Sequence, residues 1–151
     1  MSQGNKATSE KRYREFIEQT VKTGQIWGLK SKEGWATSSS VEYEDTGVLP
    51  FWSNPDYASA CAKEDWSEYH PEEFSLSEFL EHWCIGMDND NALVGTNWDA
   101  NLFGMEVEPL ELALEILEEL ELKKKSVNFL NYPSLEEFEN KIMLLLEEKQ
   151  E

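Results

Sequence analysis

The sequence predicts an α+β fold, in which a small, mainly antiparallel sheet is packed by several amphipathic helices and is followed by a C-terminal helical pair. Three observations support this class. Segments with apolar residues at helical spacing alternate along the chain with short segments typical of strands. The 151 residues contain no internal repeat. An apolar content of 40%, with six tryptophans, is sufficient for one hydrophobic core in a chain of this length.

The N-terminal part is expected to form a tail, a helix and a β-hairpin. Residues 1–8 are assigned to a flexible N-terminal tail. Ser9 is a suitable N-cap for a helix that ends at Gly24. The segments QIWGLK and GWATSSS are typical of strands, and the polar, glycine-containing turn between them indicates a hairpin.

The next segments predict a strand and a helix. VLPFW is typical of a short strand, and Pro50 indicates a sheet edge or a bulge because proline has no N–H to donate. Ser53 and Asp56 stand at the spacing of a capping box. A helix is therefore expected over residues 54–66.

A second capping box predicts another helix. Ser75 and Glu78 have the capping spacing, and the helix is expected to end before Gly86. Its core face is predicted to hold the apolar residues at helical spacing, Leu76, Phe79, Leu80 and Trp83. The segments NALVGTNW and MEVEP follow and predict two short strands that pair.

The C-terminal part is expected to be helical. Pro109 is suited to the first turn of a leucine-rich helix, and Ser134 with Glu137 indicates the start of a last helix. We expect one α+β domain over residues 9–125, with residues 126–151 as a helical extension packed on it. The leucine surface is broad enough for a second neighbour, either within the chain or from another copy. The sequence therefore leaves open a monomer and a homodimer formed through the C-terminal helices.

The composition restricts the kinds of partner. The chain has 31 acidic and 13 basic residues, which give a formal net charge of −18. Nucleic acids and anionic membranes need cationic protein groups, so neither is an expected partner, whereas a basic protein is. No apolar run has membrane-spanning length and no segment is typical of a signal peptide, so we expect a cytoplasmic protein. Cys61 and Cys84 lie in apolar helical segments and are expected to be reduced and buried.

No recognisable catalytic, metal-binding or cofactor-binding pattern is present in the sequence. The residues Cys61, His70, His82 and Cys84 are the soft metal ligands, and none of them stands at the spacing of a zinc site. The DNDN turn places Ala92, whose side chain has no oxygen, at the third ligand position of a calcium loop. We therefore expect no metal or cofactor and assign no catalytic residue. The sequence favours a protein without enzymatic activity but does not decide the question.

Five residues are candidates for a binding site: Trp52, Asn54, Asp56, Asn97 and Trp98. The two tryptophans adjoin polar loops, and loops beside a rigid sheet are where binding residues concentrate. An aromatic pocket near these two rings would indicate a small-molecule-binding or enzymatic domain. The alternative is that the rings belong to the core.

Four segments, taken in order, resemble a known family: WGLKSKEGWA, VLPFWSNPDYASACA, FSLSEFLEHW and ALVGTNWDANLFGMEVEPLEL. Their order is similar to that of the small bacterial family known as domain of unknown function 2750. The resemblance covers roughly Tyr13 to Leu120 and leaves the tail from Ser126 outside. It implies a compact single-domain bacterial protein and assigns no reaction and no residue roles.

Acidity, small size and the lack of a catalytic pattern together lead to one functional expectation. We expect a non-enzymatic acidic binding protein, such as an inhibitor or immunity-type antagonist of a basic protein partner. The alternative is the small-molecule-binding or enzymatic domain with an aromatic pocket.

Overall fold

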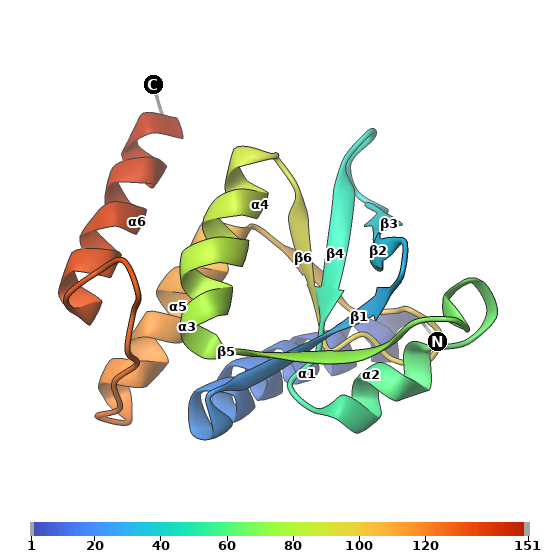
Figure 1. Ribbon diagram of the computed structural model, residues 1–151. Helices are drawn as coiled ribbons and strands as arrows, with labels where there is room; N and C mark the ends of the chain where they lie inside the picture. Colours follow the sequence, from blue (N-terminus) through green and yellow to red (C-terminus); the bar gives the residue numbers. More distant parts are fainter. Residues whose placement is uncertain (1, 150–151) are drawn as a thin grey trace.

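The computed structural model describes residues 2–149 and has the predicted α+β class (Figure 1). Its strands form two small sheets instead of one. The first sheet has the order β2-β1-β5 and consists of Gly34–Trp35, Gln25–Ser31 and His70–Ser75. The second has the order β3-β4-β6-β7 and consists of Ser38–Ser39, Gly47–Phe51, Leu93–Thr96 and Met105–Val107.

The N-terminal helix α1 spans Ser2–Thr23. The assignment of residues 1–8 to a tail with a helix start at Ser9 is therefore wrong for residues 2–8, and Met1 lies outside the described residues. No proline interrupts this segment, so the helix extends past Ser9 toward the N-terminus. The helix ends as predicted at Gly24, which has a φ of 75° and donates from its N–H to the carbonyl of Thr20 at 2.8 Å.

The predicted hairpin exists but is short. β1 and β2 pair only through Lys30 with Trp35 and Ser31 with Gly34. Most of β1 pairs instead with β5, in an antiparallel register that runs from the pair Gln25 and Ser75 to the pair Lys30 and His70. The returning segment GWATSSS is divided, because its end forms β3 of the second sheet.

A two-residue contact joins the sheets. The backbone N–H of Trp27 in β1 donates to the carbonyl of Trp52 at 2.9 Å, and the N–H of Trp52 donates back at 2.8 Å. In a strand, the backbone nitrogens of alternate residues point to the same side, so the nitrogen of Pro50 points to the same side as the N–H of Trp52. On that side Pro50 lies beyond the end of β3 and before the contact of Trp52 with β1. β4 lies between β3 and β6, so of the two alternatives, a sheet edge or a bulge, the sheet edge is wrong. The proline costs no ladder hydrogen bond at this point.

The helix expected over residues 54–66 differs from the prediction. Helix α2 spans Pro55–Cys61, and its N-cap is Asn54 rather than Ser53, since the Asn54 side chain accepts from the N–H of Asp56 at 2.7 Å. A separate 3₁₀ turn, η1, follows over Glu64–Trp66. The predicted single helix over residues 54–66 is therefore divided in two.

The helix after β5 is longer than predicted. It consists of consecutive segments, α3 Leu76–Glu78, the π-helical η2 Phe79–Cys84 and α4 Ile85–Asn89. The Ser75 hydroxyl accepts from the N–H of Glu78 at 3.2 Å, as the capping box predicted. Gly86 lies inside α4 and does not end it. The predicted core face is confirmed for three fully buried residues, Leu76, Phe79 and Leu80, and Trp83 packs against them half-buried.

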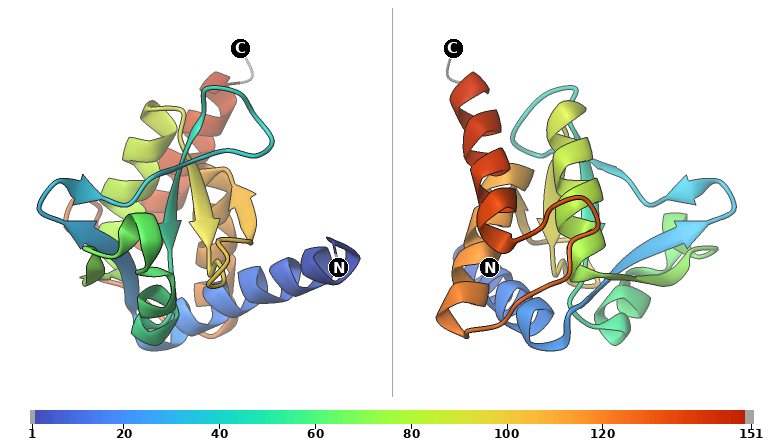
Figure 2. Two further views of the ribbon diagram at one scale, coloured as in Figure 1. Left: turned by 90° about the vertical axis from the view of Figure 1, so that its right-hand side faces the viewer. Right: turned by 60° about the vertical axis from the view of Figure 1, so that its left-hand side comes forward.

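The C-terminal helices pack against each other within the chain. α5 spans Pro109–Leu122 and α6 spans Leu135–Lys149, with the predicted cap at Ser134. Figures 1 and 2 place α6 beside α5 and the helix after β5. Phe138 and Ile142 of α6 are fully buried in the core cluster that includes the leucine face of α5.

Buried residues form two clusters. The first holds the apolar faces of α1, α5, α6 and the helix after β5. The second lies around Trp52 and includes Cys61 and Trp98. Both cysteines are free and buried, as predicted. None of the helices in the described part of the chain is long and apolar enough to cross a membrane.

Candidate functional site

The predicted binding residues lie beyond the carboxyl ends of two neighbouring parallel strands. β4 and β6 pair in parallel, with Phe51 opposite Thr96 at their ends. The chain leaves β4 through Trp52 and Ser53, and it leaves β6 through Asn97 and Trp98. Because both strands end at the same sheet edge, these two loops meet there. In open sheets with parallel strands, ligands commonly bind outside this edge.

Trp52 is a core residue in this arrangement. Its side chain has no exposed surface, and its indole N–H donates to the carbonyl of Trp98 at 3.0 Å. A buried indole with a satisfied N–H stabilises the fold and does not contact solvent. The structure therefore places Trp52 behind the site, and the prediction that its ring lines a pocket is wrong.

Trp98 lies between two glycines of the segment GTNWDANLFG. A Cβ at Gly95 would lie 2.5 Å from Cε2 of the indole, and a Cβ at Gly104 would meet the same ring. The indole N–H donates to the carbonyl of Met105 at 3.1 Å. The two glycines therefore leave the space that the ring occupies, and only 4% of Trp98 remains exposed.

Asn97 connects three parts of the chain. It has a φ of 47°, a left-handed conformation that asparagine tolerates. Its side-chain oxygen accepts from the N–H of Ser53 at 2.9 Å, and its amide nitrogen donates to the Ser53 hydroxyl at 3.0 Å and to the carbonyl of Arg12 at 3.4 Å. The Ser53 hydroxyl in turn donates to Gln19 at 2.7 Å. This buried network fixes α1 and both loops relative to one another.

Asn54 and Asp56 do not lie together with Asn97 and Trp98. Asn54 is occupied as the N-cap of α2, and Asp56 is exposed in the first turn of that helix. The structure thus brings Asn97 and Trp98 together at one site and leaves Asn54 and Asp56 at the helix start.

A pocket of about 280 Å³ opens beside Asn97 and Trp98. Its walls come from α1, α2 and the loop after β6, through Arg12, Glu15, Tyr57, Ala60, Asn97, Trp98, Asp99 and Ala100. Arg12 forms an ion pair with Asp99 at 3.5 Å, and the hydroxyl of Tyr57 donates to Glu15 at 3.0 Å. The hydrogen bond to Glu15, together with partial burial, raises the pKa of Tyr57, so its hydroxyl stays protonated at neutral pH.

Sequence reasoning missed four polar residues of this pocket. One is Asp99 in the loop after β6, and the other three are Arg12, Glu15 and Tyr57. These three lie on the outer faces of α1 and α2, where polar residues carry no periodic signal of their own. The spacing of Arg12 with Glu15, one helical turn apart, could have indicated a common face but not its partner.

The β1–β2 hairpin projects from the body of the molecule (Figure 2). A second hollow, of about 520 Å³, is lined in part by residues of this hairpin. We call it the acidic groove. It is lined by Ser31, Lys32, Glu33, Glu64, Asp65, Ser67, Glu68, Tyr69 and His70. Four acidic residues and one lysine thus line the groove, and all five of these charged residues are exposed. The local field in the groove is therefore negative.

Cys61 lines a third hollow, of about 260 Å³, and is a poor nucleophile there. Burial and the nearby carboxylate of Asp99 raise the pKa of its thiol to about 11. The thiol donates to the carbonyl of Asp99 at 3.1 Å. At neutral pH it is protonated, and a thiol is much less reactive than a thiolate. Among residues 2–149, no group of three or more His, Cys, Asp or Glu side chains is arranged to hold a metal ion.

The fold and its hollows define a class of protein: an acidic α+β protein with two small sheets, a closed core and open surface sites. More particularly, the chain belongs to the family described as "Protein of unknown function (DUF2750)", whose model matches residues 13–116. The match includes both strand-end loops and most of α5, and α6 lies outside it. No match was found among curated proteins or among solved structures.

Proposed function

We propose that this protein is a non-enzymatic binding protein whose acidic groove captures a basic protein partner, in the manner of an inhibitor or an immunity-type antagonist. The main support is the groove itself, in which Glu33, Glu64, Asp65 and Glu68 surround a hollow of about 520 Å³. Exposed carboxylates around a concave surface suit the lysine and arginine side chains of a partner.

The charge of the whole chain supports the same function. A net charge of −18 attracts a basic partner from a distance and raises the rate of encounter. The groove then provides a concave surface with negative charge at which the partner can bind. Binding of this kind weakens steeply as salt increases.

An unpaired strand edge next to the groove supplies a second feature. β5 is at the edge of its sheet, and no strand among the described residues pairs with its outer side. His70 begins this strand and also lines the groove. An extended segment of a partner can add to such an edge through backbone hydrogen bonds, while its basic side chains reach the carboxylates.

The experiment compares two charge-matched variants. The groove variant carries E33Q, E64Q, D65N and E68Q, and the control carries E136Q, E137Q, E147Q and E148Q on α6. Both change the formal net charge from −18 to −14, because each neutralises four carboxylates. All eight substituted residues are exposed, so both proteins are expected to fold.

Binding of a fluorescent decalysine peptide at low salt is the measurement. Four exposed charge pairs at about 0.3–0.5 kcal/mol each predict an affinity loss of about tenfold for the groove variant. The loss of binding free energy in the control should be less than about half of the loss in the groove variant. Equal losses in the two variants would show that diffuse charge alone binds the peptide, and no binding by the wild type would refute the proposal.

A further inference from the structure

We infer that the pocket between α1, α2 and the loop after β6 binds a free amino acid, with Arg12 receiving its carboxylate and Glu15 its ammonium group. We call this pocket the strand-end pocket. It is separate in its lining residues from the acidic groove, so this inference goes beyond the proposed capture of a basic protein.

The place of the pocket in the fold favours a ligand. It lies at the edge where the parallel strands β4 and β6 end, which is the edge where sheets with parallel strands commonly bind small molecules. The walls are fixed before any ligand arrives, because Asn97 is bonded to Ser53 and Trp98 lies against Gly95 and Gly104. A preformed pocket loses little conformational entropy on binding.

Arg12 has hydrogen-bond donors available for a carboxylate. Among the described residues, its guanidinium forms one ion pair, with Asp99 at the long distance of 3.5 Å. A guanidinium has five N–H donors arranged as a planar fork, and a carboxylate can bind to two of them at once. About 31% of the Arg12 side chain is exposed, so a ligand can reach it from the pocket.

Glu15 is held in position and keeps one carboxylate oxygen available. Its Oε2 atom accepts from the amide of Gln19 at 3.2 Å and from the hydroxyl of Tyr57 at 3.0 Å. No hydrogen bond within the described part of the chain involves its Oε1 atom. An ammonium group is a donor of opposite charge that suits this oxygen.

Both charges lie in one small space with apolar surface beside them. Arg12 and Glu15 are three residues apart on α1 and therefore face the same side. Ala60 and the ring of Tyr57 supply apolar contacts for a side chain. A volume of about 280 Å³ is near the lower limit of ligand pockets, which suits one amino acid better than a nucleotide or a peptide.

The first part of the test defines the ligand chemistry. The twenty standard amino acids are titrated against the ¹⁵N-labelled full chain, and the indole N–H of Trp98 and the amide of Asn97 are followed. We expect at least one amino acid to shift these signals in a saturable manner. Its amide derivative lacks the carboxylate and its N-acetyl derivative lacks the ammonium group, so each should bind at least about tenfold more weakly.

The second part tests the two residues with matched controls. Arg12→Gln and Glu15→Gln should each weaken binding by about tenfold or more. Lys11→Gln and Glu10→Gln change the same charges on exposed positions of α1 outside the pocket and should leave the affinity within about twofold. Thermal melting of each variant confirms that it is folded.

Three outcomes would overturn the inference. These are the absence of a saturable shift with any of the twenty amino acids, binding of either blocked derivative as tight as that of the parent amino acid, and equal effects of the pocket variants and their controls. None of them bears on the acidic groove, because the groove is tested with a different probe and different residues.

Discussion

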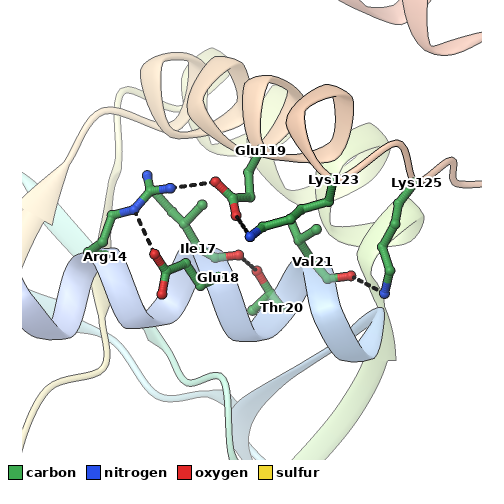
Figure 3. A network of polar contacts seen from close by, with 8 residues as sticks. All are labelled: Arg14, Ile17, Glu18, Thr20, Val21, Glu119, Lys123 and Lys125. Carbon is green, nitrogen blue, oxygen red and sulfur yellow. Dashed lines mark hydrogen bonds and ion pairs between the residues drawn. The ribbon is translucent and has the colours of Figure 1, made fainter.

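Arg14 of α1 pairs with the buried carboxylate of Glu119 of α5, a residue 105 positions later in the chain (Figure 3). Only 2% of the Glu119 side chain is exposed, and Lys123 lies at 3.8 Å from its other oxygen. Arg14 also bonds to Glu18 on its own helix at 3.2 Å. A buried charge requires such partners, so this pair aligns α1 with α5.

Removing the partner of this buried carboxylate should destabilise the protein. Arg14→Ala leaves Glu119 with the distant Lys123 alone, and we expect the free energy of unfolding to fall by about 2 kcal/mol. In the double variant Arg14→Ala/Glu119→Leu the buried charge is also absent, so part of the loss should be recovered. Urea unfolding measures both. A double variant less stable than Arg14→Ala would contradict this account, and Lys11→Ala is the control for an exposed cation on α1.

The glycines around Trp98 provide a second prediction. Gly95→Ala places a methyl group 2.5 Å from the indole, so the ring or the strand must move and stability should fall by about 2–3 kcal/mol. Gly86→Ala is the matched control, because a Cβ there meets nothing within 4 Å and the residue is helical. The control should gain about 0.5–1 kcal/mol. If both variants melted at the wild-type temperature, the close contact with Trp98 would be absent.

The carboxylate of Glu81 attaches the C-terminal extension to the rest of the chain. It accepts from the backbone N–H of Leu130 at 2.6 Å and of Asn131 at 2.7 Å. Glu81→Ala should therefore increase amide hydrogen exchange at these two positions while α1 remains protected. Glu136→Ala, on the exposed surface of α6, should change neither region. Unchanged exchange at Leu130 and Asn131 in the Glu81 variant would mean that other contacts hold the loop.

The thiol of Cys61 should titrate far above neutral pH. In a Cys84→Ala background, the rate of alkylation by a small reagent should rise with pH to a midpoint of about 11, because burial and Asp99 raise the pKa of Cys61. Asp99→Asn keeps the hydrogen-bond acceptor and removes the charge, so the midpoint should move down. A midpoint near the ordinary value of 9.0 in the parent protein would contradict the burial of this thiol.

The same pKa has a consequence for stability, and its sign is defined. The folded-state pKa lies above the ordinary value of 9.0, so the folded protein holds this proton more tightly than the unfolded chain does. Its contribution to stability is complete below about pH 9 and is lost as the pH rises through about 11. Replacing Cys61 by serine should remove this part of the pH dependence.

Local patterns predicted most of the helices, two of their caps and the pairing of strands that follow one another in the chain, β1 with β2 and β6 with β7, but not the pairing of distant strands. Ser75 and Ser134 cap their helices as expected, because capping depends on residues a few positions apart. The parallel pairing of β4 with β6 was not predicted, since no local pattern names the partner of a strand. The division into two sheets was missed for the same reason.

The candidate site was predicted in part. Asn97 and Trp98 lie at the strand-end pocket, and the glycines on either side of Trp98 explain why that segment is so distinctive. Trp52 also adjoins a polar loop and is entirely buried, because it lies between the two sheets. Burial depends on neighbours that are distant in sequence, so the two tryptophans could not be distinguished before the structure was known.

The order in which the paired elements are connected has a consequence for synthesis of the chain. Gln25 of β1 can pair with Ser75 only after β5 has been synthesised. Likewise, Arg14 of α1 can pair with the buried Glu119 only after α5 has been synthesised. While the ribosome adds these residues, the apolar face of α1 has no complete core to join. Long-range closure of this kind slows folding, because the loop entropy is lost before the contacts form. The exposed carboxylates of different growing chains repel one another, and we expect this repulsion to limit aggregation during this interval.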